Sequence, residues 1–326
     1  MDKYKILITT GLSGADIGGP FQYAPHLKTE FQKMGHEVKV VSYGKTEISL
    51  PVGVRHLYFF IKVMLSVLWA DKVIALDTFS VGVPSMLATK LFKKMIMIRV
   101  GGDFLWESYV ERTGEKITLK QFNSNFPNFN LKEKIILYFT KFLINYAEML
   151  VFNTEWQREI WQRSYHIPET KTAVIRNFIP EKQEGNKPKV KNFLWAGRRI
   201  KLKNLELMKD IPNIEIMGYL SHDQLMGQIR DCYAVILPSF SEVCPNFILE
   251  AASFGKPFIV TEETGLKEIY NTGGIFINPF DKIALKQAIL DMLDQTKYTN
   301  YVKELISTNQ SHSWQEIANK FLSIHK

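Results

Sequence analysis

Short apolar runs alternate along the whole chain with longer stretches in which apolar residues recur at helical spacing. Runs that are apolar throughout are typical of strands buried on both faces of a parallel sheet. The pattern therefore predicts βαβ units and an α/β fold. The predicted strands cover residues 3–10, 37–43, 71–77, 95–100, 148–153 and 172–177, and then 192–197, 213–218, 233–238, 256–260 and 274–279.

The alternation stops once, at the polar segment PEKQEGNKPKVK of residues 180–191, which predicts a linker. We therefore expect two doubly wound, Rossmann-like domains that face a cleft, at residues 1–185 and 186–311. Residues 312–326 resemble a closing helix, capped by Ser311 or Ser313 and expected to pack back on the first domain.

Composition supports a globular protein with an anionic partner. Of 326 residues, 46% are hydrophobic and 23% are charged, and the net charge is +8. The lysines are spread along the chain, so no nucleic acid partner is expected. Cys232 and Cys244 match neither a metal site nor a disulfide framework, which favours a reducing cytoplasm. The N-terminal apolar run is too short for a signal peptide and fits a first strand.

A glycine-rich loop follows the first predicted strand. Gly11, Gly14, Gly18 and Gly19 precede a predicted helix, where glycines let a ligand approach the backbone closely. The spacing is not that of a dinucleotide-binding fingerprint. A flexible loop without a ligand remains the alternative.

The stretch LWAGRRIKLKN places two cations directly after the first strand of the second domain. Arg198 can make a forked contact with a diphosphate, and Lys203 can act as a point charge. A solvated basic loop is an equally good interpretation of these residues alone.

Two glutamates flank the start of a predicted helix in LPSFSEVCPNFILEAASFGKPFIV. Pro245 suits the first helical position, so Glu242 is expected in the preceding loop and Glu250 inside the helix. The helix N-terminus between them favours phosphate, and carboxylates accept hydrogen bonds from sugar hydroxyls. One ligand with a sugar, phosphates and a ribose would span this spacing. The alternative, in which both glutamates lie on the surface of a solvated helix, is disfavoured because the rest of the segment consists mostly of apolar or small residues.

These residues resemble the retaining glycosyltransferases of family 4, which have the GT-B fold. PSFSEVCPNFILEAASFGKPFIVT is similar to their E-x7-E signature, and AGRRIKLKN to their phosphate clamp. The glycine loop, VFNTEWQREIW, VIRNFIP and IEIMGYLSHDQL fall in the family's order, so the resemblance covers almost the whole chain.

The resemblance implies a role for each matching residue. Glu242 would bind the donor sugar near its anomeric carbon, Glu250 the ribose, and Arg198 and Lys203 the diphosphate. The expected catalytic residues are Glu242, Arg198, Lys203 and Asp103. The expected donor contacts are Gly18, Gly19, Arg198, Lys203, Gly218, Tyr219, Glu242, Cys244, Asn246, Phe247 and Glu250.

Two departures from the family pattern change the expected contacts. After Glu242 the family commonly has Gly-Phe-Gly, but this sequence has Val-Cys-Pro. Pro245 lacks an N–H, so the backbone amides of Cys244, Asn246 or Phe247 must donate to the ligand instead. In RVGGDFLWE a glycine stands where the family often has histidine. Asp103 and Glu107 therefore become candidates for donor or acceptor contacts, with a buried or capping Asp103 as the alternative.

The resemblance implies a hexosyltransferase that retains anomeric configuration and moves sugar from a nucleoside-diphosphate donor to a glycan or lipid-linked acceptor, as in surface polysaccharide or glycolipid synthesis. No D-x-D pair is present, so neither a metal nor a cofactor is expected. A non-catalytic GT-B partner subunit and a sugar-nucleotide epimerase are the two alternatives.

A membrane contact is a further expectation. Residues 131–150, LKEKIILYFTKFLINYAEML, carry Lys132, Lys134 and Lys141 beside a broad apolar face. Such a helix can lie on anionic lipid at the inner face of the membrane, although a helix buried against the sheet is the more common case.

Overall fold

The structure is a computed structural model that describes residues 3–11, 19–218, 220–308 and 310–324. The chain forms two compact units. The first comprises residues 1–105, 127–176 and 314–326, and the second comprises residues 106–126 and 177–313. The domain boundaries expected from the sequence, at residues 185 and 311, stay a prediction.

The first unit is built on a parallel six-stranded sheet with the order β2-β1-β3-β4-β5-β6. Its strands are β1 (Lys5–Thr10), β2 (Glu37–Ser42), β3 (Lys72–Ala75), β4 (Ile96–Val100), β5 (Met149–Phe152) and β6 (Thr172–Val174). Strand β1 lies between β2 and β3 and is apolar on both sides because helices cover both faces of the sheet, so Ile6, Leu7 and Ile8 are fully buried.

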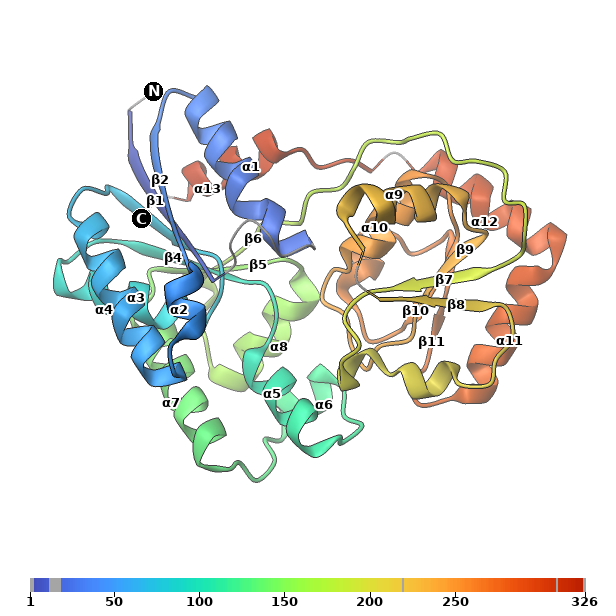
Figure 1. Cartoon of the computed structure of the whole chain (residues 1–326), viewed down its shortest axis with the longest axis horizontal. Coiled ribbons are helices and arrows are strands. Elements are labelled where there is room, and N and C mark those ends of the chain that lie inside the picture. The colour runs from blue at the N-terminus through green and yellow to red at the C-terminus, as the bar shows by residue number, and fades with distance from the viewer. Residues whose placement is uncertain (1–2, 12–18, 219, 309, 325–326) are drawn as a thin grey trace. The chain divides into compact units, whose positions relative to one another are not determined.

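Helices cover both faces of this sheet. They are α1 (Gly19–Lys33), α2 (Lys45–Ser49), α3 (Val52–Val67), α4 (Gly82–Leu91), α7 (Leu131–Tyr146), α8 (Glu155–Tyr165) and α13 (Trp314–Ser323), with the 3-10 turn η1 (Glu169–Lys171). Since β2 and β3 lie on opposite sides of β1, right-handed crossovers place α1 on one face and α3, α4 and α7 on the other (Figure 1).

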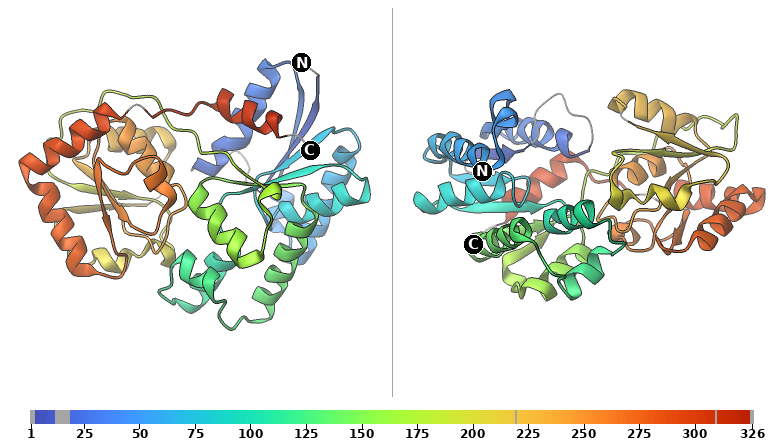
Figure 2. Two further views of the ribbon diagram at one scale, coloured as in Figure 1. Left: turned by 180° about the vertical axis from the view of Figure 1, so that it is seen from behind. Right: turned by 60° about the horizontal axis from the view of Figure 1, so that its bottom comes forward.

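The C-terminal helix α13 packs on α1, where the Trp314 ring stacks on His26 at 4.7 Å between ring centroids. Figure 2 shows the same pairing from behind, with α13 in red beside α1 in blue. The helix begins at Trp314, directly after Ser313, one of the two residues expected to cap it.

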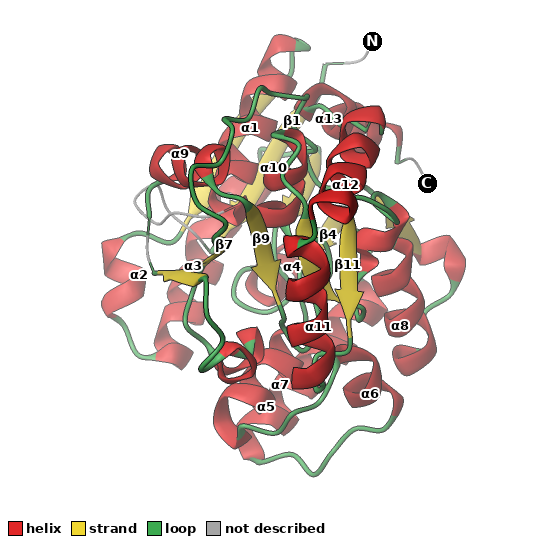
Figure 3. Ribbon diagram, turned by 90° about the vertical axis from the view of Figure 1, so that its right-hand side faces the viewer, coloured by secondary structure: helices red, strands yellow, loops and turns green. Residues whose placement is uncertain are grey.

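The second unit contains a parallel five-stranded sheet with the order β11-β10-β9-β7-β8. Its strands are β7 (Phe193–Ala196), β8 (Ile214–Met217), β9 (Ala234–Leu237), β10 (Phe258–Thr261) and β11 (Gly274–Ile277). Its helices are α9 (His222–Asp231), α10 (Asn246–Ser253), α11 (Lys282–Leu293) and α12 (Gln295–Ser307), with the 3-10 turns η2 (Lys201–Lys203), η3 (Leu205–Met208) and η4 (Gly265–Glu268). Figure 3 shows α11 running alongside β11.

The two sheets confirm the α/β prediction. Ten of the eleven predicted apolar runs contain a whole strand, the run at 256–260 contains all of β10 except Thr261, and every strand pair is parallel. The core of the second unit consists mainly of these strands and the buried side of α10, including Phe193, Trp195, Ile236, Leu249 and Phe258.

Part of the N-terminal half belongs to the second unit. This segment, residues 106–126, contains most of α5 (Phe104–Thr113) and all of α6 (Leu119–Ser124). The Leu119 amide donates to Ser241 Oγ at 2.9 Å, and the Lys201 amide donates to Glu111 Oε1 at 2.6 Å. These bonds attach the segment to the loops that follow β9 and β7.

Within the described part of the chain, no helix combines the length and apolar character needed to cross a membrane.

Candidate functional site

The segments that directly follow β7 and β9 contain most of the candidate residues of the second unit. These are neighbouring parallel strands, so their carboxyl ends share one edge of the sheet. Ligands of doubly wound sheets bind at such an edge.

A buried asparagine positions the lysine of this site. Asn204, directly after η2, has a left-handed backbone with φ of 56°, which asparagine tolerates better than most residues. Its side-chain amide donates to the carbonyl oxygens of Pro238, at 3.0 Å, and Pro279, at 2.7 Å. These bonds tie the loop after β7 to the loops after β9 and β11 and hold Lys203 beside Glu242.

The Glu242 carboxylate is held by a cation and a hydroxyl. Lys203 Nζ lies 2.6 Å from Glu242 Oε1, and Ser239 Oγ donates to the same oxygen at 2.5 Å. The side chains of Lys203 and Glu242 are only 20% and 11% exposed. Shielding from water strengthens such a charge-assisted bond and gives the carboxylate a defined orientation.

The backbone of Glu242 is also fixed. Its amide donates to the Glu263 carbonyl at 3.0 Å, and its carbonyl accepts from the Gly265 amide at 3.3 Å. A parallel bridge pairs Glu242 with Thr264. These bonds connect the loop after β9 to the loop after β10.

Helix α10 begins one residue later than the sequence predicts. Pro245 is the N-cap rather than the first helical residue, since its ψ of 109° is extended and its carbonyl accepts from the amides of Ile248 and Leu249. Asn177 Nδ2 supports this start by donating to the Cys244 carbonyl, at 3.1 Å, and to Asn246 Oδ1, at 2.9 Å. First-turn amides such as those of Asn246 and Phe247 lack intrahelical acceptors and can face an anion.

Glu250 lies about one turn inside α10 and pairs with a histidine. His222 Nε2 lies 3.1 Å from Glu250 Oε1, and this hydrogen bond raises the pKa of His222 above its usual value, against the opposing effect of burial. His222 is the first residue of α9, which Ser221 caps. Gly218 lies directly after β8, whereas Tyr219 is outside the described residues.

Arg198 follows β7 and is exposed. Gly197 precedes it with φ of 152°, a conformation that side-chain-bearing residues rarely adopt. The described residues offer its guanidinium neither a hydrogen bond nor an ion pair. Arg198 therefore differs from Lys203, whose charge is already matched within the protein.

The remaining predicted residues come from the N-terminal half. Gly19 begins α1 after β1, Asp103 lies just after β4, and both belong to the first unit, whereas Glu107 lies on α5 in the second. Gly18 is outside the described residues. Asp103 is buried and raises the pKa of Tyr165, although burial of the phenol contributes more. This burial agrees with the structural alternative for Asp103, and its acceptor role stays a prediction.

Sequence reasoning gave no role in the site to several residues that hold it together. Ser239, Asn204, Asn177 and His222 each bond a predicted residue or its loop, yet only the fold brings them there. Glu263 was also missed. Burial raises the pKa of its carboxyl, and its Oε2 has no hydrogen-bond partner among the described residues.

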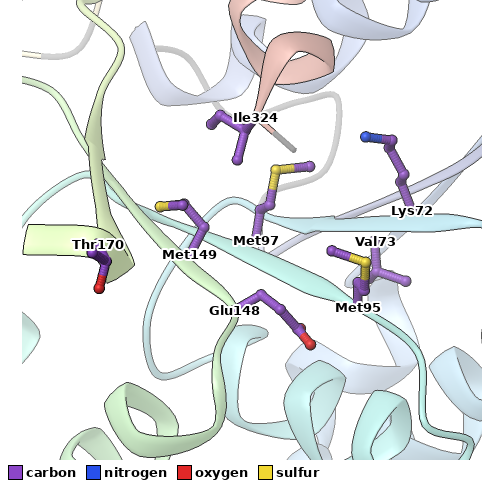
Figure 4. A pocket seen from close by; sticks show the side chains of 8 residues that line it. All are labelled: Lys72, Val73, Met95, Met97, Glu148, Met149, Thr170 and Ile324. Atoms are coloured by element: carbon purple, nitrogen blue, oxygen red, sulfur yellow. The ribbon is translucent and has the colours of Figure 1, made fainter. Parts of the chain in front are cut away.

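A cavity of about 170 Å³ in the first unit contains none of the predicted residues. Figure 4 shows Met95, Met97 and Met149 around it, with Lys72 and Glu148. These residues lie at or near the first residues of β3, β4 and β5. The cavity is therefore at the amino edge of the sheet, away from the edge where doubly wound sheets bind ligands.

Comparison with known sequences identifies most of the second unit. Residues 169–295 match the family profile described as "Glycosyl transferases group 1". These residues form a group 1 glycosyltransferase domain. The match includes Arg198, Lys203, Glu242 and Glu250, and it confirms the resemblance to this family.

A curated relative supports the assignment. An uncharacterized glycosyltransferase of Methanocaldococcus jannaschii is 29% identical to this chain over 96 residues. The match covers 29% of this chain and spans only 27% of that relative's length.

Solved structures match nearly the whole chain. Sucrose-phosphate synthase of Thermosynechococcus elongatus has a TM-score of 0.72 at 14% identity and covers 99% of this chain and 98% of its own. Anabaena HepE in complex with UDP-glucose has a TM-score of 0.67 at 13% identity, with 98% and 99% covered. These likenesses show the fold, which is GT-B, as predicted.

Proposed function

We propose that the protein is a retaining hexosyltransferase that moves a sugar from a UDP-sugar donor to a glycan or lipid-linked acceptor. The single observation that carries this proposal is the Lys203–Glu242 pair beside the start of α10, inside a group 1 glycosyltransferase domain. The UDP-glucose in the HepE complex motivates the choice of uridine.

In this proposal each group meets the part of the donor that suits its charge. Arg198, Lys203 and the first-turn amides of α10 meet the diphosphate and its developing negative charge. Glu242 accepts hydrogen bonds from the sugar hydroxyls, and Glu250 from the ribose. Lys203 can donate hydrogen bonds to both Glu242 and the diphosphate because an ammonium group has three N–H donors.

The proposed reaction is a front-face displacement. A bond forms between the acceptor oxygen and the anomeric carbon while the bond from that carbon to the phosphate oxygen breaks. The acceptor's proton passes to the departing phosphate, so no enzyme nucleophile is needed. Retention, the hexose and a role in cytoplasmic synthesis of surface polysaccharide or glycolipid rest on the family resemblance.

The decisive experiment is a thermal-shift screen against UDP, GDP, ADP and CDP, followed by UDP-sugar turnover. A nucleotide at one hundred times its Kd stabilises the folded state by about 2.7 kcal/mol. UDP should therefore raise Tm most, and Arg198→Ala should reduce the shift while Arg199→Ala, its exposed neighbour, should not. Equal behaviour with all four nucleotides would contradict the uridine assignment, and no shift at all would contradict the donor site.

The two alternatives give different products. A non-catalytic partner subunit would leave a labelled UDP-sugar intact with any acceptor. An epimerase would convert the sugar nucleotide to an isomer of equal mass without an acceptor. Release of UDP that depends on an added acceptor supports the transferase.

A further inference from the structure

Helix α3 carries an apolar stripe that the described part of the chain leaves exposed. Its exposed apolar residues recur three or four positions apart, which places them on one side of the helix. They are Val54, Leu57, Tyr58, Ile61 and Leu65, with Leu68 just after the helix end. Leu65 is 75% exposed, whereas Phe59, Val63 and Val67 on the opposite side are fully buried.

Helix α7 carries a second stripe of the same kind. Leu131, Ile135, Tyr138 and Tyr146 are exposed, and Leu131 is 76% exposed. The other side of the helix is buried at Ile136, Thr140, Leu143 and Ile144. One side of α7 therefore packs in the protein, as the buried-helix alternative requires, and the outer side remains apolar.

Helix α4 lies between the two helices and packs against both α3 and α7 (Figure 1). Most of α4 is buried, but Lys90 and Leu91 at its end and Lys93 just after it are exposed. Lys90, Lys93, Lys94, Tyr146 and Glu148 are among the residues that line a cavity of about 260 Å³, and Lys90 Nζ lies 3.4 Å from the Tyr146 ring centroid. We call the outer surface of these three helices the α3–α7 face.

Positive charges outnumber negative ones on this face, where Glu148 is the partly buried carboxylate beside the lysines of the cavity. Lys90, Lys93, Lys132, Lys134 and Lys141 are exposed. Among the residues described for α3, α4 and α7 the one carboxylate is Glu133, which is buried and caps the start of α7. Two copies of such a face would bring many lysines together with few carboxylates, so self-association is disfavoured. An anionic surface would complement both its apolar and its basic residues.

We propose that the α3–α7 face docks on an anionic lipid surface. The apolar stripes insert at the level of the headgroups, Tyr58 and Tyr138 lie at the interface as aromatic residues commonly do, and the lysines contact lipid phosphates. Apolar insertion and basic attraction are the two signals that stable peripheral binding requires. This inference does not depend on the donor site. The sequence suggested lipid contact through α7 alone, and the structure adds α3 and α4 to the proposed contact surface.

Vesicle flotation tests the apolar part. The full chain should float with phosphatidylcholine vesicles that contain 30% phosphatidylglycerol and much less with phosphatidylcholine alone. The double variant Leu57→Ser, Leu65→Ser should reduce binding at least tenfold, because each leucine loses apolar contact. The matched control is Ile283→Ser, Leu290→Ser on α11, which removes two equally exposed residues from the second unit and should bind normally.

Three lysine substitutions test the basic part. Lys93→Gln, Lys132→Gln and Lys134→Gln together should lower binding about 100-fold, since each basic residue near an anionic surface adds about a fivefold gain. Lys286→Gln and Lys303→Gln on α11 and α12 serve as the control. Circular dichroism and UDP-induced thermal shift verify that the variants are folded, so loss of lipid binding is separable from failure of the donor site.

Equal flotation with both kinds of vesicle, or unchanged binding by both variant sets, would overturn the proposal. A concentration-dependent dimer that Leu57→Ser, Leu65→Ser abolishes, without flotation by the parent chain, would also overturn it and assign the face to a second copy.

Discussion

Lys203 Nζ and Glu242 Oε1 lie 2.6 Å apart, so two side chains proposed to hold different parts of one donor also hold each other. Both are largely shielded from water, and Ser239 completes the shell of the carboxylate. Removing one charge therefore affects its partner as well as the ligand.

The first prediction concerns stability. Lys203→Ala should lower the free energy of unfolding by about 1–3 kcal/mol, because it leaves the Glu242 carboxylate poorly satisfied. Adding Glu242→Gln should restore part of the loss, since the amide needs no cation. Urea denaturation of the two single variants and the double variant measures this coupling. Strictly additive losses would show that the pair contributes nothing, and Lys201→Ala, two residues away, is the control.

Arg198 should behave differently because it has no partner among the described residues. Arg198→Ala should leave Tm unchanged and weaken UDP binding by about 1.5–3 kcal/mol, the usual contribution of a charge-assisted hydrogen bond. Titration calorimetry with Arg199→Ala alongside measures the effect. Identical UDP affinities for the two variants would show that Arg198 does not bind the diphosphate.

The two glutamates should differ in kinetic effect. Positive charge develops on the sugar in the transition state, so contacts from Glu242 should strengthen there and Glu242→Gln should mainly lower kcat. Glu250 would hold the ribose equally before and during reaction, so Glu250→Gln should mainly raise the donor KM. Steady-state kinetics with varied UDP-sugar separates the two effects. Wild-type turnover by Glu242→Gln at saturating donor would falsify its assignment.

The His222–Glu250 pair predicts a pH effect with a defined sign. The hydrogen bond to Glu250 raises the pKa of His222, with a smaller contribution from Asp223, while burial lowers it. The pair should stabilise the fold fully below pH of about 6.5, the ordinary histidine pKa, and lose this contribution as pH rises through the raised pKa.

An NMR titration of the His222 ring checks this expectation. Its midpoint should lie above that of a free histidine and fall in Glu250→Gln. Asp223→Asn should produce a smaller decrease. A midpoint that does not respond to Glu250→Gln would show that the two side chains are not paired in solution.

Local pattern was enough to predict the strands and the family. Apolar runs such as KILITT form strands because a strand buried on both faces needs apolar residues on both sides, and this requirement is visible in a few consecutive residues. The E-x7-E spacing and the Arg198–Lys203 pair are equally local. They therefore identified the group 1 glycosyltransferase domain without any knowledge of tertiary contacts.

Tertiary structure decided which side chains meet. Lys203 and Glu242 are 39 positions apart, His222 and Glu250 are 28 apart, and Leu119 lies 122 positions before Ser241. No periodicity encodes these pairs, because the parallel topology brings the carboxyl ends of separate strands to one edge. The exposed stripe of α3 has the same origin. The helix is apolar on more than one side, and only the packing of α4 and the sheet determines which of those sides remains exposed.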